Sequence, residues 1–193
     1  RYILALLGEL DATLRTAVDD FDFNTYVRAL TEFCNEDLSA FYFDIRKDSL
    51  YCDAPGDPRR RAYRTVLDTL FHALIRYAAP VLVFTAEEVW GTGYPDGGSV
   101  HILEWPDLSH LRHPGPRAGL PLGSSAAPEG SGTPGQARGD GFIEKWATLR
   151  GLRQQVTEAI EPLRRDKLVR SSLEAEVVVP ASAVPEGVGD DLL

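Results

Sequence analysis

The sequence has no methionine, only two cysteines and no long uninterrupted apolar run. Cys34 and Cys52 are too few for a disulfide framework, and they lack the Cys-x-x-Cys spacing of a structural zinc site. We therefore expect two reduced thiols. No segment approaches the roughly 20 apolar residues that a membrane-spanning helix needs, and no basic-then-apolar signal segment opens the chain. These absences predict a cytoplasmic protein without a membrane partner.

The missing methionine includes position 1, and the first residues, RYILALLGEL, already have the pattern of a helix interior. We therefore expect the chain to begin inside a larger polypeptide. Its 193 residues, of which 44% are hydrophobic, are enough to bury one substantial core and a small second unit.

No catalytic constellation is recognisable. The sequence has no phosphate-cradling glycine motif, no His-x-x-x-His helix and no nucleophile elbow. Its four histidines lack metal-ligand spacing; they are His72, His101, His110 and His113. We predict neither an active site nor a bound cofactor or metal within this chain.

Apolar residues recur at spacings of three and four along most of the chain, which predicts a mainly α-helical bundle. We expect helices over residues 2–20, 21–47 and 59–79. Asp22 or Asn24 is suited to cap the second helix, and Asp57 followed by Pro58 the third. Pro80 should end or kink the third helix. In a short fourth helix, Thr85 and Glu88 have the spacing of a capping box, in which two side chains satisfy each other's backbone N–H groups.

The second half of the chain is less regular. SVHILEWPD, residues 99–107, alternates as an extended segment does. Residues 113–140 contain twelve glycines and prolines among 28 positions, which predicts a linker or disordered loop. A helical period returns from Phe142, and LEAEVVVPA alternates like a strand that begins a small, truncated α/β unit. We therefore divide the chain into a bundle (1–112), a loop (113–140) and a helix with the start of a junction region (141–193).

Charge is unevenly distributed. The net charge of −9 argues against a general nucleic-acid coat, because non-specific binding depends on cations that displace counterions from phosphates. Residues 1–38 carry three basic and eight acidic side chains, whereas residues 145–170 carry seven basic and three acidic ones. A polyanion would meet only part of the surface.

Six basic residues are expected to meet at one end of the bundle, where the second predicted helix ends and the third begins. We call them the basic corner: Arg46, Lys47, Arg59, Arg60, Arg61 and Arg64. Exposed basic runs are often only solvated helix faces, and cations at a helix C-terminus complement its dipole. Arginines at a helix start oppose the dipole, which favours a second interpretation, a surface that binds a polyanion.

A second group of basic residues lies in the last predicted helix and its exit, with one tryptophan beside it. Its members are Trp146, Arg150, Arg153, Arg164, Arg165 and Lys167. An indole beside guanidinium groups suits unstacked bases better than a duplex. A position in the core is the alternative for Trp146, and the pattern favours it.

Four segments carry a resemblance to a known family: FNTYVRALTEFCNEDLSAFYFDIRKDSLYC, PRRRAYRTVLDTLFHALIRYAAPVLVFTAEEVW, SVHILEWPD and LRQQVTEAIEPLRRDKLVRSSLEAEVVV. Together they resemble the region that follows the catalytic domain of bacterial-type isoleucyl-tRNA synthetases, which are class Ia enzymes. The likeness covers nearly the whole chain except the Gly/Pro-rich stretch. It implies a helical anticodon-binding domain of the class Ia type, followed by the start of a C-terminal junction region.

The resemblance also implies a function and partners. The parent enzyme would attach isoleucine to its tRNA with ATP and Mg²⁺, whereas this chain, which lacks the HIGH and KMSKS signatures, would recognise the anticodon stem-loop. Expected partners are isoleucine tRNA and the upstream catalytic and editing domains, in a monomer. The zinc-binding cysteine pairs of many bacterial members are absent here. We assign the basic corner and the second group to tRNA from charge and geometry. A valyl or leucyl enzyme, or a purely structural helical module, are the alternatives.

Overall fold

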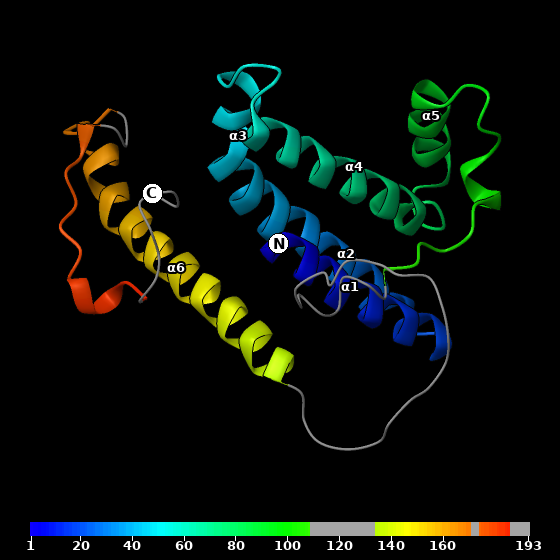
Figure 1. Ribbon diagram of the computed structural model, residues 1–193, viewed down its shortest axis with the longest axis horizontal. Coiled ribbons are helices and arrows are strands. Elements are labelled where there is room, and N and C mark those ends of the chain that lie inside the picture. The colour runs from blue at the N-terminus through cyan, green and yellow to red at the C-terminus, as the bar shows by residue number, and fades with distance from the viewer. Residues whose placement is uncertain (109–133, 171–173, 186–193) are drawn as a thin grey trace. The chain divides into compact units, whose positions relative to one another are not determined.

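The computed structural model describes residues 1–108, 134–170 and 174–185. The chain divides into two compact units, Arg1–Pro114 and Gly115–Leu193, each of which is described by itself. The first unit is a bundle of helices (Figure 1), which confirms the mainly α-helical class. The predicted boundary between residues 112 and 113 lies outside the described residues.

A helical hairpin opens the first unit. Helix α1 (Tyr2–Asp19) is followed by a tight turn, and α2 (Phe23–Glu32) folds back along it. The carboxylate of Asp22 accepts a hydrogen bond from the backbone N–H of Thr25 at 3.0 Å, so Asp22 is the cap that the sequence predicted as one of two candidates.

The second predicted helix is continuous but not uniform. After α2, residues Phe33–Phe43 form a π-helix, η1, and the chain then returns to the α conformation in α3 (Asp44–Tyr51). A π-helix has i→i+5 hydrogen bonds and a wider turn than an α-helix. Phe33, Leu38 and Phe41 are nevertheless buried. Phe43 lies on the exposed side of this stretch, so it does not build the core.

Helix α4 (Pro58–Ala78) begins as the sequence predicts. The Asp57 carboxylate accepts a hydrogen bond from the Arg59 N–H at 2.7 Å, and the helix ends before Pro80. The predicted capping box is wrong. Helix α5 (Val83–Gly93) starts at Val83, two residues before Thr85, and its N-cap residue makes no side-chain hydrogen bond. Thr85 therefore lies inside the first turn of the helix and cannot be its N-cap.

The segment after α5 adds little regular structure. Within SVHILEWPD, Val100–Ile102 form a short 3-10 helix, η2, rather than the predicted fully extended segment, and only the residues from Leu103 onward are extended. The extended part brings Trp105 and Leu108 against the core of α1, α2 and α4. The same core contains Ile3, Leu7, Leu10, Leu14, Tyr26, Phe33, Leu38, Leu70, Ala73 and Tyr77.

A buried polar network joins α1, α4 and the segment after η2. Its centre is the carboxylate of Asp11, which is 1% exposed. One oxygen accepts hydrogen bonds from the Tyr77 hydroxyl at 2.8 Å and from the Trp105 indole N–H at 2.7 Å. The other pairs with the Arg15 guanidinium at 3.0 Å, and Arg15 also donates to the Pro106 carbonyl. The network therefore ties three separate segments to one side chain.

The tyrosines of the bundle predict a loss of stability at alkaline pH. Burial raises the pKa of Tyr26 and of Tyr42 to about 12 in each case. An unfolded tyrosine has a pKa of about 10, so the unfolded chain releases these protons first. Their stabilising contribution is complete below about pH 10 and is lost as the pH rises toward about 12. We expect urea midpoints to fall over that window, and to fall less in a Tyr26→Phe/Tyr42→Phe variant. An equal fall in the variant would contradict this.

The second unit contains one long helix, α6 (Pro134–Arg165), which extends the helix predicted from Phe142 toward the N-terminus. Residues 134–140, which we predicted as loop, are therefore helical, and residues 113–133 lie outside the described residues. The predicted strand is wrong for the part of it that the structure describes. Residues 175–180 form no strand, because no described segment pairs with them, and a 3-10 turn, η5 (Ala181–Ala183), follows.

Candidate nucleic-acid interface

The fold brings the six residues of the basic corner to the junction of α3 and α4, as the sequence predicted. Arg46 and Lys47 lie in α3, and the other four lie in the first two turns of α4. A short connection, residues 52–57, joins the two helices (Figure 1). The Arg60 guanidinium donates a hydrogen bond to the Asp53 carbonyl at 2.8 Å and holds this connection against α4.

The six side chains differ in what they already contact. Arg60 is half-buried and tied to the connection, so its main role here is to hold the corner together. Lys47 pairs with Asp44 at 2.8 Å on the surface of α3. Arg59 is 73% exposed and lies 3.9 Å from the Asp57 carboxylate. Arg61 and Arg64 are exposed. The corner therefore offers at least three outward guanidinium groups on the first two turns of one helix.

Arg46 lies near two tyrosines that pack on each other. The rings of Tyr42 and Tyr63 meet edge to face with 5.5 Å between their centroids. Burial raises the pKa of Tyr42 and of Tyr63, and the nearby positive charge of Arg46 opposes the rise at both phenols. Arg46 is half-buried, whereas Arg59, Arg61 and Arg64 are exposed.

The second predicted group does not form one cluster. Trp146, Arg150 and Arg153 follow one another at helical spacing, and Trp146 packs edge to face on Phe142 with 6.3 Å between ring centroids. Arg164 is a further 14 residues along α6 from Arg150, which corresponds to about 21 Å of helix. Arg164 pairs with Glu161 at 3.7 Å, and with Arg165 it occupies the last turn of the helix. Cations there complement the helix dipole, so the distal members need no ligand to account for them.

The comparison with known families decides what kind of domain carries this corner. Residues 1–179 match the family described as the anticodon-binding domain of tRNA ligase. The chain belongs to this family. The match includes both the bundle with its basic corner and the whole of α6.

Curated relatives of this anticodon-binding domain are isoleucine–tRNA ligases. The protein of that name from Zymomonas mobilis is 53% identical over 188 residues, which cover 95% of this chain and 17% of the relative. Those from Agrobacterium fabrum and Gluconobacter oxydans are 41% and 40% identical, and they cover 93% and 97% of this chain. The chain spans less than a fifth of the length of these curated relatives, 17%, 16% and 17% respectively.

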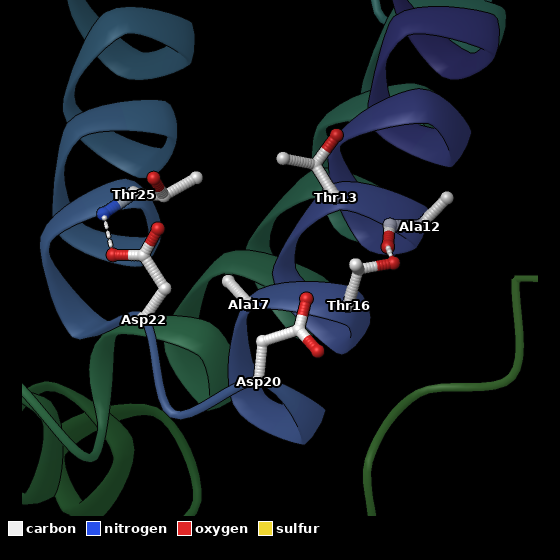
Figure 2. Close-up of a pocket in the computed structure, with 7 residues that line it drawn as sticks. All are labelled: Ala12, Thr13, Thr16, Ala17, Asp20, Asp22 and Thr25. Carbon is white, nitrogen blue, oxygen red and sulfur yellow. Dashed lines mark hydrogen bonds between the residues drawn. The ribbon is translucent and has the colours of Figure 1, made fainter.

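The C-terminal end of α1, which lies away from the basic corner of this anticodon-binding domain, is acidic. Tyr2 contacts Phe41, with 6.1 Å between ring centroids, which places the start of α1 near η1, just before α3. The end of the 18-residue helix is about 25 Å away. An open cavity of about 350 Å³ lies there. Figure 2 shows the threonines and the carboxylates of Asp20 and Asp22 that line it. Such a lining repels phosphate, so the two ends of the hairpin differ in the ligands they favour.

The sequence predicted the turn through Tyr51 only as an edge of the RNA-facing surface, and Tyr51 itself was not assigned to tRNA. Tyr51, the last residue of α3, is 79% exposed. An aromatic residue four positions after Lys47 was the available signal for Tyr51, since positions i and i+4 share a helix face.

Among the described residues, no group of three or more His, Cys, Asp or Glu side chains could hold a metal ion. Cys34 is half-buried and Cys52 is exposed, and both are free thiols. Burial raises the pKa of the Cys34 thiol, which makes it less reactive. In the same described part of the chain, every helix is too short or too polar to cross a membrane.

Proposed function

We propose that this chain binds the anticodon stem-loop of isoleucine tRNA, as the anticodon-binding part of an isoleucine–tRNA ligase. The observation that carries the proposal is the basic corner, a set of outward cations on a chain with a net charge of −9 that belongs to an anticodon-binding family. The isoleucine–tRNA ligases among its relatives support isoleucine tRNA as the partner.

The corner can hold a single-stranded loop by contacts to its backbone. Arg59, Arg61 and Arg64 would bind phosphates, because guanidinium groups make paired, charge-assisted hydrogen bonds to phosphate oxygens. Lys47 would exchange its carboxylate partner for a phosphate. Arg60 would keep the connection between α3 and α4 in place. Anticodon bases would be unstacked from one another, since sequence-specific proteins read single-stranded RNA through splayed bases.

The starts of helices normally favour anions, so arginines there require an explanation. Arg59 and Arg61, in the first turn of α4, oppose the positive end of the helix dipole, at about 0.3–1 kcal/mol each, and Arg64 adds a third positive charge in the second turn. Binding of a polyanion at this point offsets the repulsion among the arginines and their unfavourable interaction with the dipole. The acidic remainder of the bundle discourages RNA from docking elsewhere.

The parent protein would perform the ligation itself. We assign its ATP, its Mg²⁺ and any zinc to parts of that protein outside this chain, because the sequence contains neither HIGH nor KMSKS nor a pair of Cys-x-x-Cys cysteines. The role of this chain would be to position the tRNA so that its acceptor end reaches the catalytic domain.

A titration with whole tRNA tests the proposal. The chain is titrated with isoleucine tRNA and with a non-cognate tRNA at several salt concentrations. With about five phosphate contacts, log K should fall with log salt at a slope of about −3.5, at roughly −0.7 per contact for single strands. We expect tighter binding of the isoleucine tRNA. Binding that is undetectable, or equal for both RNAs, would overturn the assignment and favour a structural helical module or a different amino acid.

A further inference from the structure

One aromatic side chain at the basic corner stands out because it is not packed. The sequence has seven tyrosines, and all of them lie in the described part of the chain. Tyr51 is the most exposed, at 79%, whereas Tyr63 next to it is buried. Leaving so large a ring in water forgoes the stabilisation that its burial would give. Since the neighbouring tyrosines do pack, the exposure of Tyr51 is a property of its position.

The backbone beneath Tyr51 is nevertheless held in place. Tyr51 closes α3, and the following N–H, that of Cys52, still donates to the Asp48 carbonyl at 2.8 Å. Two residues after Tyr51, the Asp53 carbonyl accepts the hydrogen bond from Arg60. An exposed ring on an anchored helix end is pre-organised for a flat ligand, because little conformational freedom is lost on binding.

The surroundings of the ring identify the chemistry of that ligand. Lys47 lies one helical turn before Tyr51 on the same face of α3. Tyr51 also lies close to Tyr63. Burial raises the pKa of Tyr63 most, and the neighbouring phenol of Tyr51 raises it further. Tyr63 is on α4, one position before Arg64. The ring of Tyr51 is therefore flanked by a lysine of α3 and by the basic first turns of α4, an arrangement that suits an aromatic ring attached to phosphate groups.

We propose that Tyr51 is the platform on which one unpaired base of the bound RNA loop stacks, while Lys47 and the exposed arginines of α4 hold the flanking phosphates. This inference rests on the proposed function and deepens it. Every base has a π-face, so stacking on a tyrosine supplies affinity for single strands without choosing among bases. Tyr51 would thus distinguish an open loop from a duplex, and the identity of the anticodon would be read at base edges by other groups.

The test compares Tyr51→Ala with Tyr51→Phe. An anticodon stem-loop of isoleucine tRNA carries 2-aminopurine at one loop position at a time. We expect Tyr51→Ala to weaken binding about 5- to 150-fold, the range for loss of one base–aromatic stack, and to abolish the fluorescence quenching of one loop position. Tyr51→Phe keeps the ring and should bind within about twofold of the unmodified chain.

Two controls separate stacking from general damage. Phe84 is 89% exposed and lies beyond the far end of the 21-residue helix α4, about 30 Å from its start, so Phe84→Ala should not change binding. A fully paired hairpin should bind Tyr51→Ala and the unmodified chain equally. If the unmodified chain shows salt-dependent loop binding that Tyr51→Ala retains in full, the platform is wrong and the proposed function stands. If the unmodified chain binds no loop at all, both are overturned.

Discussion

Reversal of three charges at the start of α4 is expected to weaken tRNA binding about 100-fold at about 0.1 M salt. The variant is Arg59→Glu/Arg61→Glu/Arg64→Glu. Each phosphate contact contributes roughly 0.7 to the slope of log K against log salt, so the loss of three contacts lowers log K by about 2 at this salt concentration and makes the slope less steep by about 2. Titration with isoleucine tRNA over a range of salt concentrations measures both quantities.

The same variant should not unfold the protein. Glutamates near a helix N-terminus interact favourably with the dipole, so the free energy of unfolding should stay equal or rise by about 1 kcal/mol. Arg60 is kept because it holds the connection between the helices. For a matched single change, Arg61→Glu is compared with Arg28→Glu, an exposed arginine of α2 outside the corner. If Arg28→Glu weakened binding as much as Arg61→Glu, the corner would not be the RNA surface.

Replacement of Asp11 by alanine is expected to lower the free energy of unfolding by about 2–5 kcal/mol, because each buried donor left without its acceptor costs about 1–3 kcal/mol. The change leaves the Tyr77 hydroxyl, the Trp105 indole N–H and the Arg15 guanidinium without their shared acceptor. Small domains have a total stability of about 5–15 kcal/mol, so this loss is a large fraction of it. Urea unfolding, followed by tryptophan fluorescence, gives the difference.

Two further variants show whether the network or the charge is responsible. Glu9→Ala removes an exposed carboxylate from the same helix and should change the free energy of unfolding by less than about 0.5 kcal/mol. Asp11→Asn keeps one oxygen as an acceptor for Tyr77 and Trp105 but loses the charge that pairs with Arg15. Its free energy of unfolding should therefore lie between those of Asp11→Ala and Glu9→Ala. Unfolding of Asp11→Ala at the same urea concentration as the unmodified chain would show that the network does not stabilise the fold.

Helical periodicity predicted most of the bundle because the apolar faces are long and end at clear signals. Asp22, Asp57 and Pro80 mark helix ends in the structure as they do in the sequence. The π-helix was not predicted, since Phe33, Leu38 and Phe41 satisfy an α-helical spacing closely enough to hide the wider turn. The capping box failed for a related reason: local spacing alone does not show that the chain is already helical after Pro80.

Asp11 shows the limit of a binary apolar pattern. Its position, four residues after Leu7 and three before Leu14, is on the buried face of α1, yet we predicted no role for it. Its partners Tyr77 and Trp105 are 66 and 94 residues away in the sequence, so their contact depends on the packed fold. The extended segment with Trp105 is held by this network, which is why its alternation did not need a neighbouring strand.

The position of the basic corner could be predicted because its members are close in the sequence. Arg46, Lys47 and the arginines of α4 meet because one short connection joins their helices. The group on α6 was too broadly defined, since the distance along a helix separates Arg150 from Arg164. The exposure of Tyr51 could not be predicted, because the same helical period that buries Tyr63 gives no information on which tyrosine the bundle leaves in solvent.

The central claim is that this chain holds the anticodon arm of a tRNA at the corner of α3 and α4. The most direct test is a competition experiment, in which labelled isoleucine tRNA bound to the chain is displaced by either its isolated anticodon stem-loop or a minihelix of its acceptor arm. We predict that the stem-loop displaces the tRNA, that the minihelix does not, and that the triple arginine variant loses this preference. Equal displacement by both RNAs, or displacement by the minihelix alone, would contradict the claim.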